Sequence, residues 1–150
     1  MVLSLKYRHG LFVLEDMVTL IRQNQAVCDF VGEACLVPVP LHSRKERERE
    51  YNQSHYIAEA FQAACLGKPQ IADLLQRIRD SASQTTFDRE TRRKRMKNAF
   101  AARRQALITP DERYILVDDV FTTGSTLNAC ATALSRAGAV NIDVITFAHG

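Results

Sequence analysis

Apolar residues recur at helical spacing in three parts of the chain. The first part predicts a helix over Leu11–Phe30, with its apolar side formed by Leu11, Leu14, Val18, Ile21 and Val27. The second predicts a helix that is capped by Asn52 or Ser54, runs to about Leu66 and stops at Gly67. Its apolar positions are Ile57, Ala60, Phe61 and Ala64. The third predicts a helix over Thr126–Ala137, which ends at Gly138 and has Leu127, Cys130, Ala131 and Leu134 on one face.

Short apolar runs between these helices predict strands. They are Ala34–Pro40, Leu74–Arg79, a short strand beginning at Ala99–Ala101, Tyr114–Val117 and Ile142–Phe147. The last two flank a loop over Phe121–Ser125 and the third helix, so they predict a parallel pair joined by a right-handed crossover. The whole pattern predicts an α/β fold, with a parallel sheet covered by helices on both faces, in one domain spanning residues 1–150.

Composition narrows the class of protein. With 46% hydrophobic and 25% charged residues, the chain is an ordinary globular one, which excludes a largely disordered protein. No apolar run approaches the roughly 18 residues of a membrane helix, and residues 1–9 lack the apolar run of a signal peptide, so we expect a cytoplasmic protein. The cysteines form no C-x-x-C pair and have apolar neighbours, which favours buried, reduced thiols over a metal site or disulfides.

Positive charge is concentrated in one segment. Residues 77–104 contain ten Lys or Arg against three Asp or Glu, whereas the whole chain carries a net charge of only +3. Within this segment, residues 81–97 are polar, basic and without an apolar period, which is typical of a functional loop or of disorder. Three interpretations remain open: a lid over an anionic ligand, a DNA contact, or a solvated surface.

The stretch YILVDDVFTTGST, from Tyr114 to Thr126, indicates a ligand site. Ligands of parallel sheets bind at the carboxyl ends of strands, where Asp118 and Asp119 are expected. The loop that follows leads into a helix N-terminus and adds hydroxyl groups and a glycine, a combination that suits a phosphate. Two carboxylates would repel that phosphate, so we expect them to bind sugar hydroxyls or Mg²⁺ instead. A response-regulator receiver also pairs acids after a strand, but too little chain follows for its later Asp and Lys.

This stretch resembles the phosphoribosyl diphosphate (PRPP) motif of type I phosphoribosyltransferases. Further segments resemble the ComF branch of that superfamily, which is tied to competence and the use of external DNA. They are LVPVPLHSRKERERE-YNQ, RIRDSASQ and the Arg-rich stretch to NAF, and with DDVFTTGST they extend the resemblance from about Lys6 to Ala148. The resemblance implies a Rossmann-like sheet in the type I phosphoribosyltransferase fold.

The resemblance also implies a site and a reaction. Asp118 and Asp119 would be the catalytic pair, binding the ribose hydroxyls partly with Mg²⁺ as a metal cofactor, and Thr122, Thr123, Gly124, Ser125 and Thr126 would hold the 5-phosphate. Pro40, Leu41, His42 and Ser43 would meet the pyrophosphate, together with Arg89 and Arg92 of a lid over residues 81–97. The reaction would be transfer of a phosphoribosyl group to or from a nucleobase-like acceptor, with exchange of pyrophosphate.

The sequence departs from the family pattern in two places. Members commonly carry a four-cysteine zinc ribbon ahead of this segment, which this sequence does not contain, and Glu50 replaces the usual glycine of Arg-Gly-Phe-Asn-Gln. The alternative hypothesis is therefore a catalytically silent PRPP-, nucleotide- or DNA-binding module acting in DNA uptake. DNA, DNA-processing proteins and a second copy of the chain remain open as partners.

Overall fold

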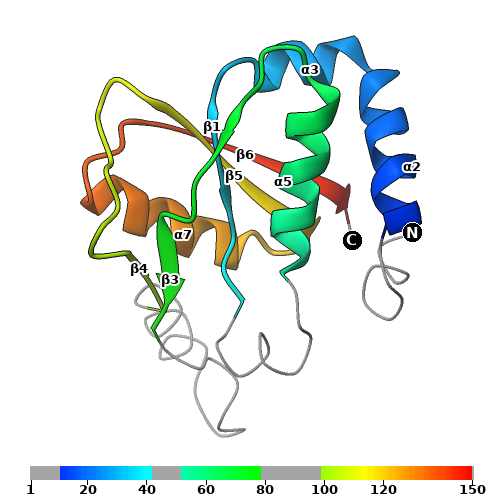
Figure 1. Cartoon of the computed structure of the whole chain (residues 1–150). Coiled ribbons are helices and arrows are strands. Elements are labelled where there is room, and N and C mark those ends of the chain that lie inside the picture. The colour runs from blue at the N-terminus through cyan, green and yellow to red at the C-terminus, as the bar shows by residue number, and fades with distance from the viewer. Residues whose placement is uncertain (1–10, 42–51, 79–98, 150) are drawn as a thin grey trace, which may run out of the picture.

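The protein is an α/β domain whose computed structural model describes residues 11–41, 52–78 and 99–149 (Figure 1). Its elements in chain order are α2 (Leu11–Arg22), α3 (Gln25–Val31), β1 (Cys35–Pro38), α5 (Gln53–Ala64), β2 (Gln70–Ile71), β3 (Leu75–Arg77), β4 (Phe100–Ala102), β5 (Arg113–Phe121), α7 (Ser125–Arg136) and β6 (Asn141–His149). The main sheet is parallel, with the strand order β2–β1–β5–β6. Strands β3 and β4 form a separate antiparallel pair.

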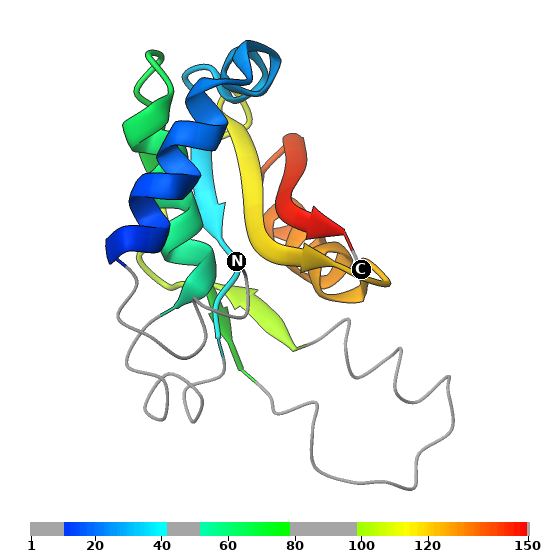
Figure 2. The same ribbon diagram turned by 90° about the vertical axis from the view of Figure 1, so that its right-hand side faces the viewer.

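Helices cover both faces of the main sheet, as the sequence predicts. Figure 2 shows α2 and α5 on one side of the sheet and α7 on the other. The alternation of β5 distributes its side chains accordingly: Ile115 and Val117 pack with α2 and α5, whereas Tyr114 and Leu116 pack with α7. All four are almost fully buried, so β5 joins the two halves of the core.

The first helix differs from its prediction because it is broken. A single helix over Leu11–Phe30 is wrong: α2 ends at Arg22, and α3 begins at Gln25. Asn24 lies at the break, where its side chain accepts a hydrogen bond from the backbone N–H of Val27 and so caps α3. Because the apolar spacing continues across the break, the sequence pattern does not reveal where α2 ends and α3 begins.

The α5 helix begins where the sequence predicts but ends earlier. Asn52 is its N-cap, and Ile57, Ala60, Phe61 and Ala64 are buried. The predicted end at Leu66 and Gly67 is wrong, because the helix ends at Ala64 with Cys65 in an extended conformation. Gly67 instead lies against the chain at Gly32, so closely that a Cβ atom would come within 2.5 Å of the Gly32 carbonyl oxygen.

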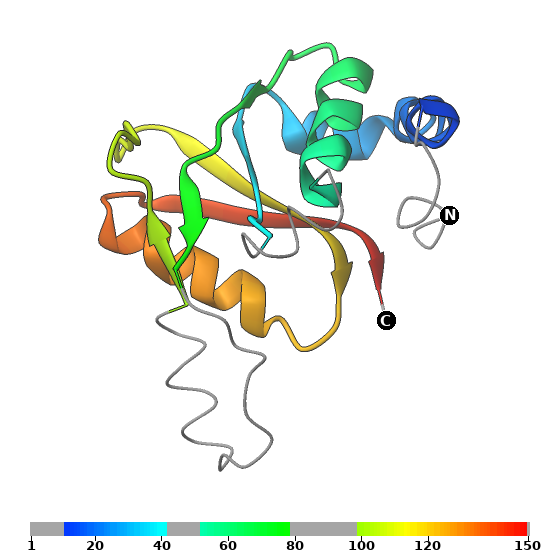
Figure 3. The ribbon, with the colours of Figure 1, turned by 60° about the horizontal axis from the view of Figure 1, so that its bottom comes forward.

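The pair β3–β4 lies against α7 rather than in the main sheet (Figure 3). Leu75 and Phe100 contribute to the same core cluster as Leu127 and Leu134 of α7, which holds the pair in place. The strand predicted over Leu74–Arg79 is thus confirmed for Leu75–Arg77, although its partner is β4. The guanidinium of Arg77 lies over the ring of Phe100, 5.4 Å from its centroid.

The connections place a switch point between β1 and β5. From β1 the chain passes through α5 to β2 on one side, and later returns to put β5 on the other side of β1. The connection through α5 thus leads from β1 toward one edge of the sheet, and the connection through α7 leads from β5 toward the other edge. In open α/β sheets, ligands bind beyond the carboxyl ends of the two strands at such a point.

Candidate functional site

The two aspartates lie at this switch point, but inside the strand. β1 pairs with β5 only as far as Pro38 and Val117, whereas β5 continues beside β6 to Phe121. The predicted end of the strand at Val117 is therefore wrong, because β6 extends the ladder by pairing Asp118 with Thr146 and Phe121 with His149. Asp118 and Asp119 thus occupy the stretch of β5 that β1 no longer accompanies.

Asp118 is held by two donors at one of its oxygens. The hydroxyl of Ser54, in the first turn of α5, donates to Oδ1 at 3.1 Å, and the backbone N–H of Asp119 donates to the same atom at 2.9 Å. Burial raises the pKa of Asp118 to about 6, and the neighbouring Asp119 charge also raises it, while the two donors act in the opposite direction. A carboxylate so perturbed at the end of a strand is typical of a functional site.

Asp118 lies close to helices from both sides of the sheet. Its Oδ1 accepts from Ser54 in α5, and its negative charge adds to the effect of burial in raising the pKa of the Cys130 thiol in α7. The adjacent carboxylates of Asp118 and Asp119 can therefore present oxygens to one ligand at this end of the sheet.

The loop after β5 presents hydroxyl and N–H groups at the start of α7. Gly124 has a left-handed backbone conformation with φ of 68°, and it is the N-cap residue of the helix. The hydroxyls of Thr123 and Ser125 are 2.9 Å apart. The N-cap residue Gly124 has no side chain to cap α7, whereas Asn24 and Asn52 cap α3 and α5. The backbone N–H of Ser125, the first residue of α7, donates to the hydroxyl of Thr123 at 3.4 Å. An anion at this N-terminus would thus meet both hydroxyl and N–H groups.

A small pocket joins this loop to the carboxylate. It has a volume of about 40 Å³, the size for one ionic group rather than a whole ligand. Its lining residues are Asp118, Val120, Thr122, Thr123, Gly124, Ser125, Thr126 and Leu127. The structure therefore brings together all five predicted phosphate-binding residues with one of the two acids.

An aromatic pair packs against the loop that follows β5. The ring of Phe121, at the end of β5, stacks on that of His149 at the end of β6, with centroids 5.7 Å apart. A Cβ atom at Gly124 would lie 3.1 Å from the same Phe121 ring. The loop therefore passes close over the ring, and glycine at this position permits both that approach and the positive φ.

The remaining predicted site residues are only partly described. Pro40 is buried and Leu41 half-buried, directly after β1. His42, Ser43, Arg89, Arg92 and the lid over residues 81–97 lie outside the described residues. Three of the cysteines are buried free thiols, as predicted, and Cys28 is a half-buried free thiol.

Ser54 is a site residue that the sequence pattern assigns only to helix capping. Its contact with Asp118 joins residues 64 positions apart, which no local pattern reveals. The one signal in the sequence is its position directly after Asn52-Gln53, where a segment that resembles the ComF pattern ends.

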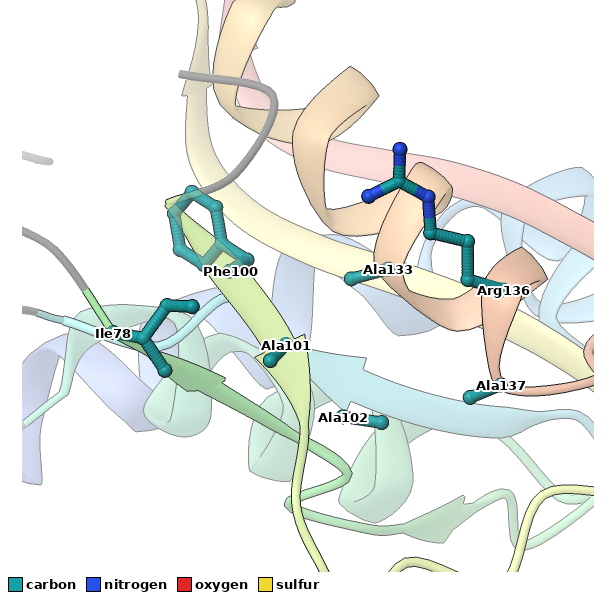
Figure 4. Close-up of a pocket in the computed structure, with 7 residues that line it drawn as sticks. All are labelled: Ile78, Phe100, Ala101, Ala102, Ala133, Arg136 and Ala137. Atoms are coloured by element: carbon teal, nitrogen blue, oxygen red, sulfur yellow. The ribbon is translucent and has the colours of Figure 1, made fainter. Parts of the chain in front are cut away.

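A larger hollow lies between the β3–β4 pair and α7, away from these groups (Figure 4). Its volume is about 440 Å³, and its lining residues are Ile78, Phe100, Ala101, Ala102, Ala133, Arg136 and Ala137. Ala133 lies eight residues along α7 from Ser125, which corresponds to about 12 Å of helix. The hollow shares no lining residue with the loop pocket, so size alone does not identify the site.

The described residues contain no cluster of three or more His, Cys, Asp or Glu that could bind a metal ion. None of the helices within the described ranges has the length and apolar character needed to cross a membrane.

Comparison with known proteins identifies the family. Over 109 residues, which are 73% of this chain, it is 33% identical to "Competence protein F" of Haemophilus influenzae and 36% identical to "DNA utilization protein YhgH" of Salmonella typhi. It is also 32% identical over 103 residues to "Competence protein ComFC" of Bacillus subtilis. The chain belongs to the ComF family. It spans about half the length of these ComF relatives: 47%, 46% and 39%, respectively.

A solved structure confirms the fold expected for a ComF protein. It is described as that of "the allosteric regulatory enzyme of purine biosynthesis", and it matches with a TM-score of 0.51 and 19% identity, over 89% of this chain and 24% of the other. At this identity the likeness shows the fold alone, which is the phosphoribosyltransferase fold predicted from the sequence. No protein-family model matches the chain.

Proposed function

We propose that this ComF protein is a phosphoribosyltransferase that binds PRPP. The observation that carries the proposal is the pocket at the end of β5, where Asp118 lines the same space as the N-terminus of α7 and its hydroxyl-rich loop. An anion site next to a carboxylate fits a ligand that offers a phosphate beside hydroxyl groups. A ribose 5-phosphate has both.

Each part of the site would bind a different part of PRPP. Residues Thr122–Thr126 would hold the 5-phosphate through hydroxyls and the N–H groups of the first turn of α7. Asp118 and Asp119 would accept hydrogen bonds from the ribose hydroxyls. The segment Pro40–Ser43 and the arginines Arg89 and Arg92 would meet the pyrophosphate.

The donor set fits Mg²⁺ that arrives with the substrate. Mg²⁺ is usually bound by one or two carboxylates together with substrate phosphates and water, rather than by a cage of protein ligands. Asp118 and Asp119 offer two carboxylates, and the described residues contain no larger cluster of ligands. These two residues would hold the ion, which would neutralise charge on the pyrophosphate.

The chemistry would be displacement of pyrophosphate from ribose C1 by a nitrogen of a nucleobase-like acceptor. The C–O bond to pyrophosphate breaks, and a C–N bond forms, with the electron pair leaving on pyrophosphate. Such a reaction depends on positioning and on charge stabilisation more than on a protein nucleophile. The contribution of this chain would be to orient the sugar at Asp118 and Asp119 and to fix its phosphate at α7.

Calorimetric titration with PRPP, with and without Mg²⁺, tests the proposal. We expect saturable binding in the wild type and none in the variant with Asp118→Asn and Asp119→Asn. The matched control replaces Asp111 and Glu112 by Asn and Gln, which changes the net charge equally in an exposed turn before β5. A folded wild type that does not bind PRPP would sink the proposal, and so would equal loss of binding in both variants.

The second candidate is a module without catalytic activity that serves DNA utilisation by binding nucleic acid. It is favoured by the ten basic residues within 77–104 and by the names of the relatives, a competence protein and a DNA utilization protein. Charge reversal at Arg92, Arg93 and Arg95 is then expected to reduce DNA affinity and the dependence of that affinity on salt. DNA affinity that is unchanged by these reversals would exclude this candidate.

A further inference from the structure

The first turn of α5 is fixed firmly against the ends of β1 and β5. The side chain of Asn52 accepts a hydrogen bond from the N–H of Ser54 at 3.1 Å through Oδ1. Through Nδ2 the same side chain donates to the carbonyl oxygen of Val39, just beyond β1, at 3.0 Å. The position of Ser54 is therefore set by the sheet edge and not by the helix alone.

The Ser54 hydroxyl restricts the orientation of the Asp118 carboxylate. Rotation about χ2 of aspartate is a soft motion with a broad distribution. Here Oδ1 accepts from both Ser54 and the N–H of Asp119, and Ser54 is only 4% exposed, so water has little access to replace it. With one oxygen held by two donors from different elements, the direction of the other oxygen is also set.

The same turn contains a polar group that the described fold does not use. Gln53 is 4% exposed, yet its side-chain nitrogen has no hydrogen-bond partner within the described residues. Buried donors without acceptors are rare and cost about 1–3 kcal/mol. A buried polar group retained at such a cost, next in sequence to the serine that contacts Asp118, indicates that the turn is organised for a ligand as well as for the helix.

We propose that Ser54 is a positioning residue of the PRPP site, which holds Asp118 in the orientation that receives the ribose hydroxyls. This inference rests on the proposed function. Ser54 acts through Asp118 and not on the phosphate, because it contacts the Asp118 carboxylate but does not line the pocket formed by Asp118 and the Thr122–Thr126 loop. A serine that served only the helix would affect stability alone.

The experiment compares PRPP with inorganic phosphate as probes by calorimetry in the whole protein. Ser54→Ala is expected to weaken PRPP binding about tenfold, the effect of a hydrogen bond to a charged group, and to leave phosphate binding unchanged. Ser54→Thr keeps the hydroxyl and is expected to restore most of the PRPP affinity. Ser135→Ala, in an exposed position near the end of α7, is the matched control and is expected to behave as the wild type.

The outcomes separate this inference from the proposed function. If the wild type binds PRPP and Ser54→Ala binds it equally well, the positioning role is wrong and the proposed function stands. If Ser54→Ala weakens PRPP and phosphate binding by the same factor, Ser54 supports the fold of the site in general, and the inference also fails. If the wild type does not bind PRPP, the proposed function fails and the inference with it.

Discussion

Replacing Asp118 by asparagine is expected to stabilise the protein at neutral pH and at the same time to abolish PRPP binding. The reason is the environment of the carboxylate, whose pKa is raised by burial from 3.8 to about 6. At neutral pH the folded protein must therefore keep a charge where its surroundings favour the neutral form. Asparagine has the same shape, and its side-chain oxygen can still accept from Ser54 and from the N–H of Asp119.

The size of the effect follows from the pKa. A rise from 3.8 to about 6 corresponds to about 3 kcal/mol of destabilisation by the charged form, at 1.36 kcal/mol per pKa unit. The amide nitrogen of asparagine needs a partner of its own, which reduces the gain. We therefore expect Asp118→Asn to raise the free energy of unfolding by about 1–2 kcal/mol at pH 7.5.

The effect has a definite dependence on pH. Below the unfolded pKa of about 3.9 the carboxyl is protonated in both states, and its charge contributes nothing to the difference. As pH rises toward the folded pKa of about 6, the unfolded state loses its proton first, so the wild type loses stability relative to the variant. Above that pH the difference is complete.

Urea unfolding of both proteins between pH 4 and pH 8 measures this difference. Asp143→Asn serves as a contrast, because Asp143 forms an ion pair with Arg113 at 2.8 Å, and its loss is expected to destabilise the protein at neutral pH. Asp111→Asn, in an exposed turn, gives the baseline for removing one negative charge. An Asp118→Asn variant no more stable than the wild type at pH 7.5 would contradict this prediction. So would a difference in the free energy of unfolding that does not grow with pH.

Three other substitutions test the local geometry. Gly67→Ala is expected to lower the free energy of unfolding by roughly 1–3 kcal/mol, because its Cβ would lie 2.5 Å from the Gly32 carbonyl oxygen; a urea midpoint equal to the wild type would contradict this. Gly124→Ala is expected to cost about 1–2 kcal/mol for its left-handed backbone and to weaken PRPP binding, which calorimetry would detect; unchanged affinity would count against the loop's role. Gln53→Met removes the unpaired amide, so thermal unfolding is expected to show unchanged or slightly higher stability; a marked loss would mean that the amide is satisfied in the folded protein.

The local elements of the site were predictable from the sequence. The loop and helix after β5 follow from Gly124, the threonines and the apolar spacing of Leu127, Cys130 and Leu134, all of which act within a few residues. Asn52 before a polar–apolar pattern marks the start of α5 in the same way. Such signals depend only on neighbouring residues, so they can be read from the sequence without knowledge of the fold.

The rest depends on contacts between distant segments. The length of β5 past Val117 is decided by pairing with β6, and the partner of β3 is decided by β4. The raised pKa of Asp118 requires the burial that α5 and α7 create around it. Neither pairing nor burial can be read from the neighbouring residues. The sequence therefore predicted Asp118 and Asp119 as a candidate pair, but neither the burial of Asp118 nor its contact with Ser54.

The separation of the β3–β4 pair from the main sheet has a consequence for how the protein can change over evolutionary time. No hydrogen bond of the ladder between β1 and β5 involves β3 or β4, and the pair is joined to the core through packing against α7. Side chains on its outer surface can therefore be replaced without shifting the register that places Asp118. Changes on the outer surface of β3–β4 can therefore accumulate independently of the geometry around Asp118.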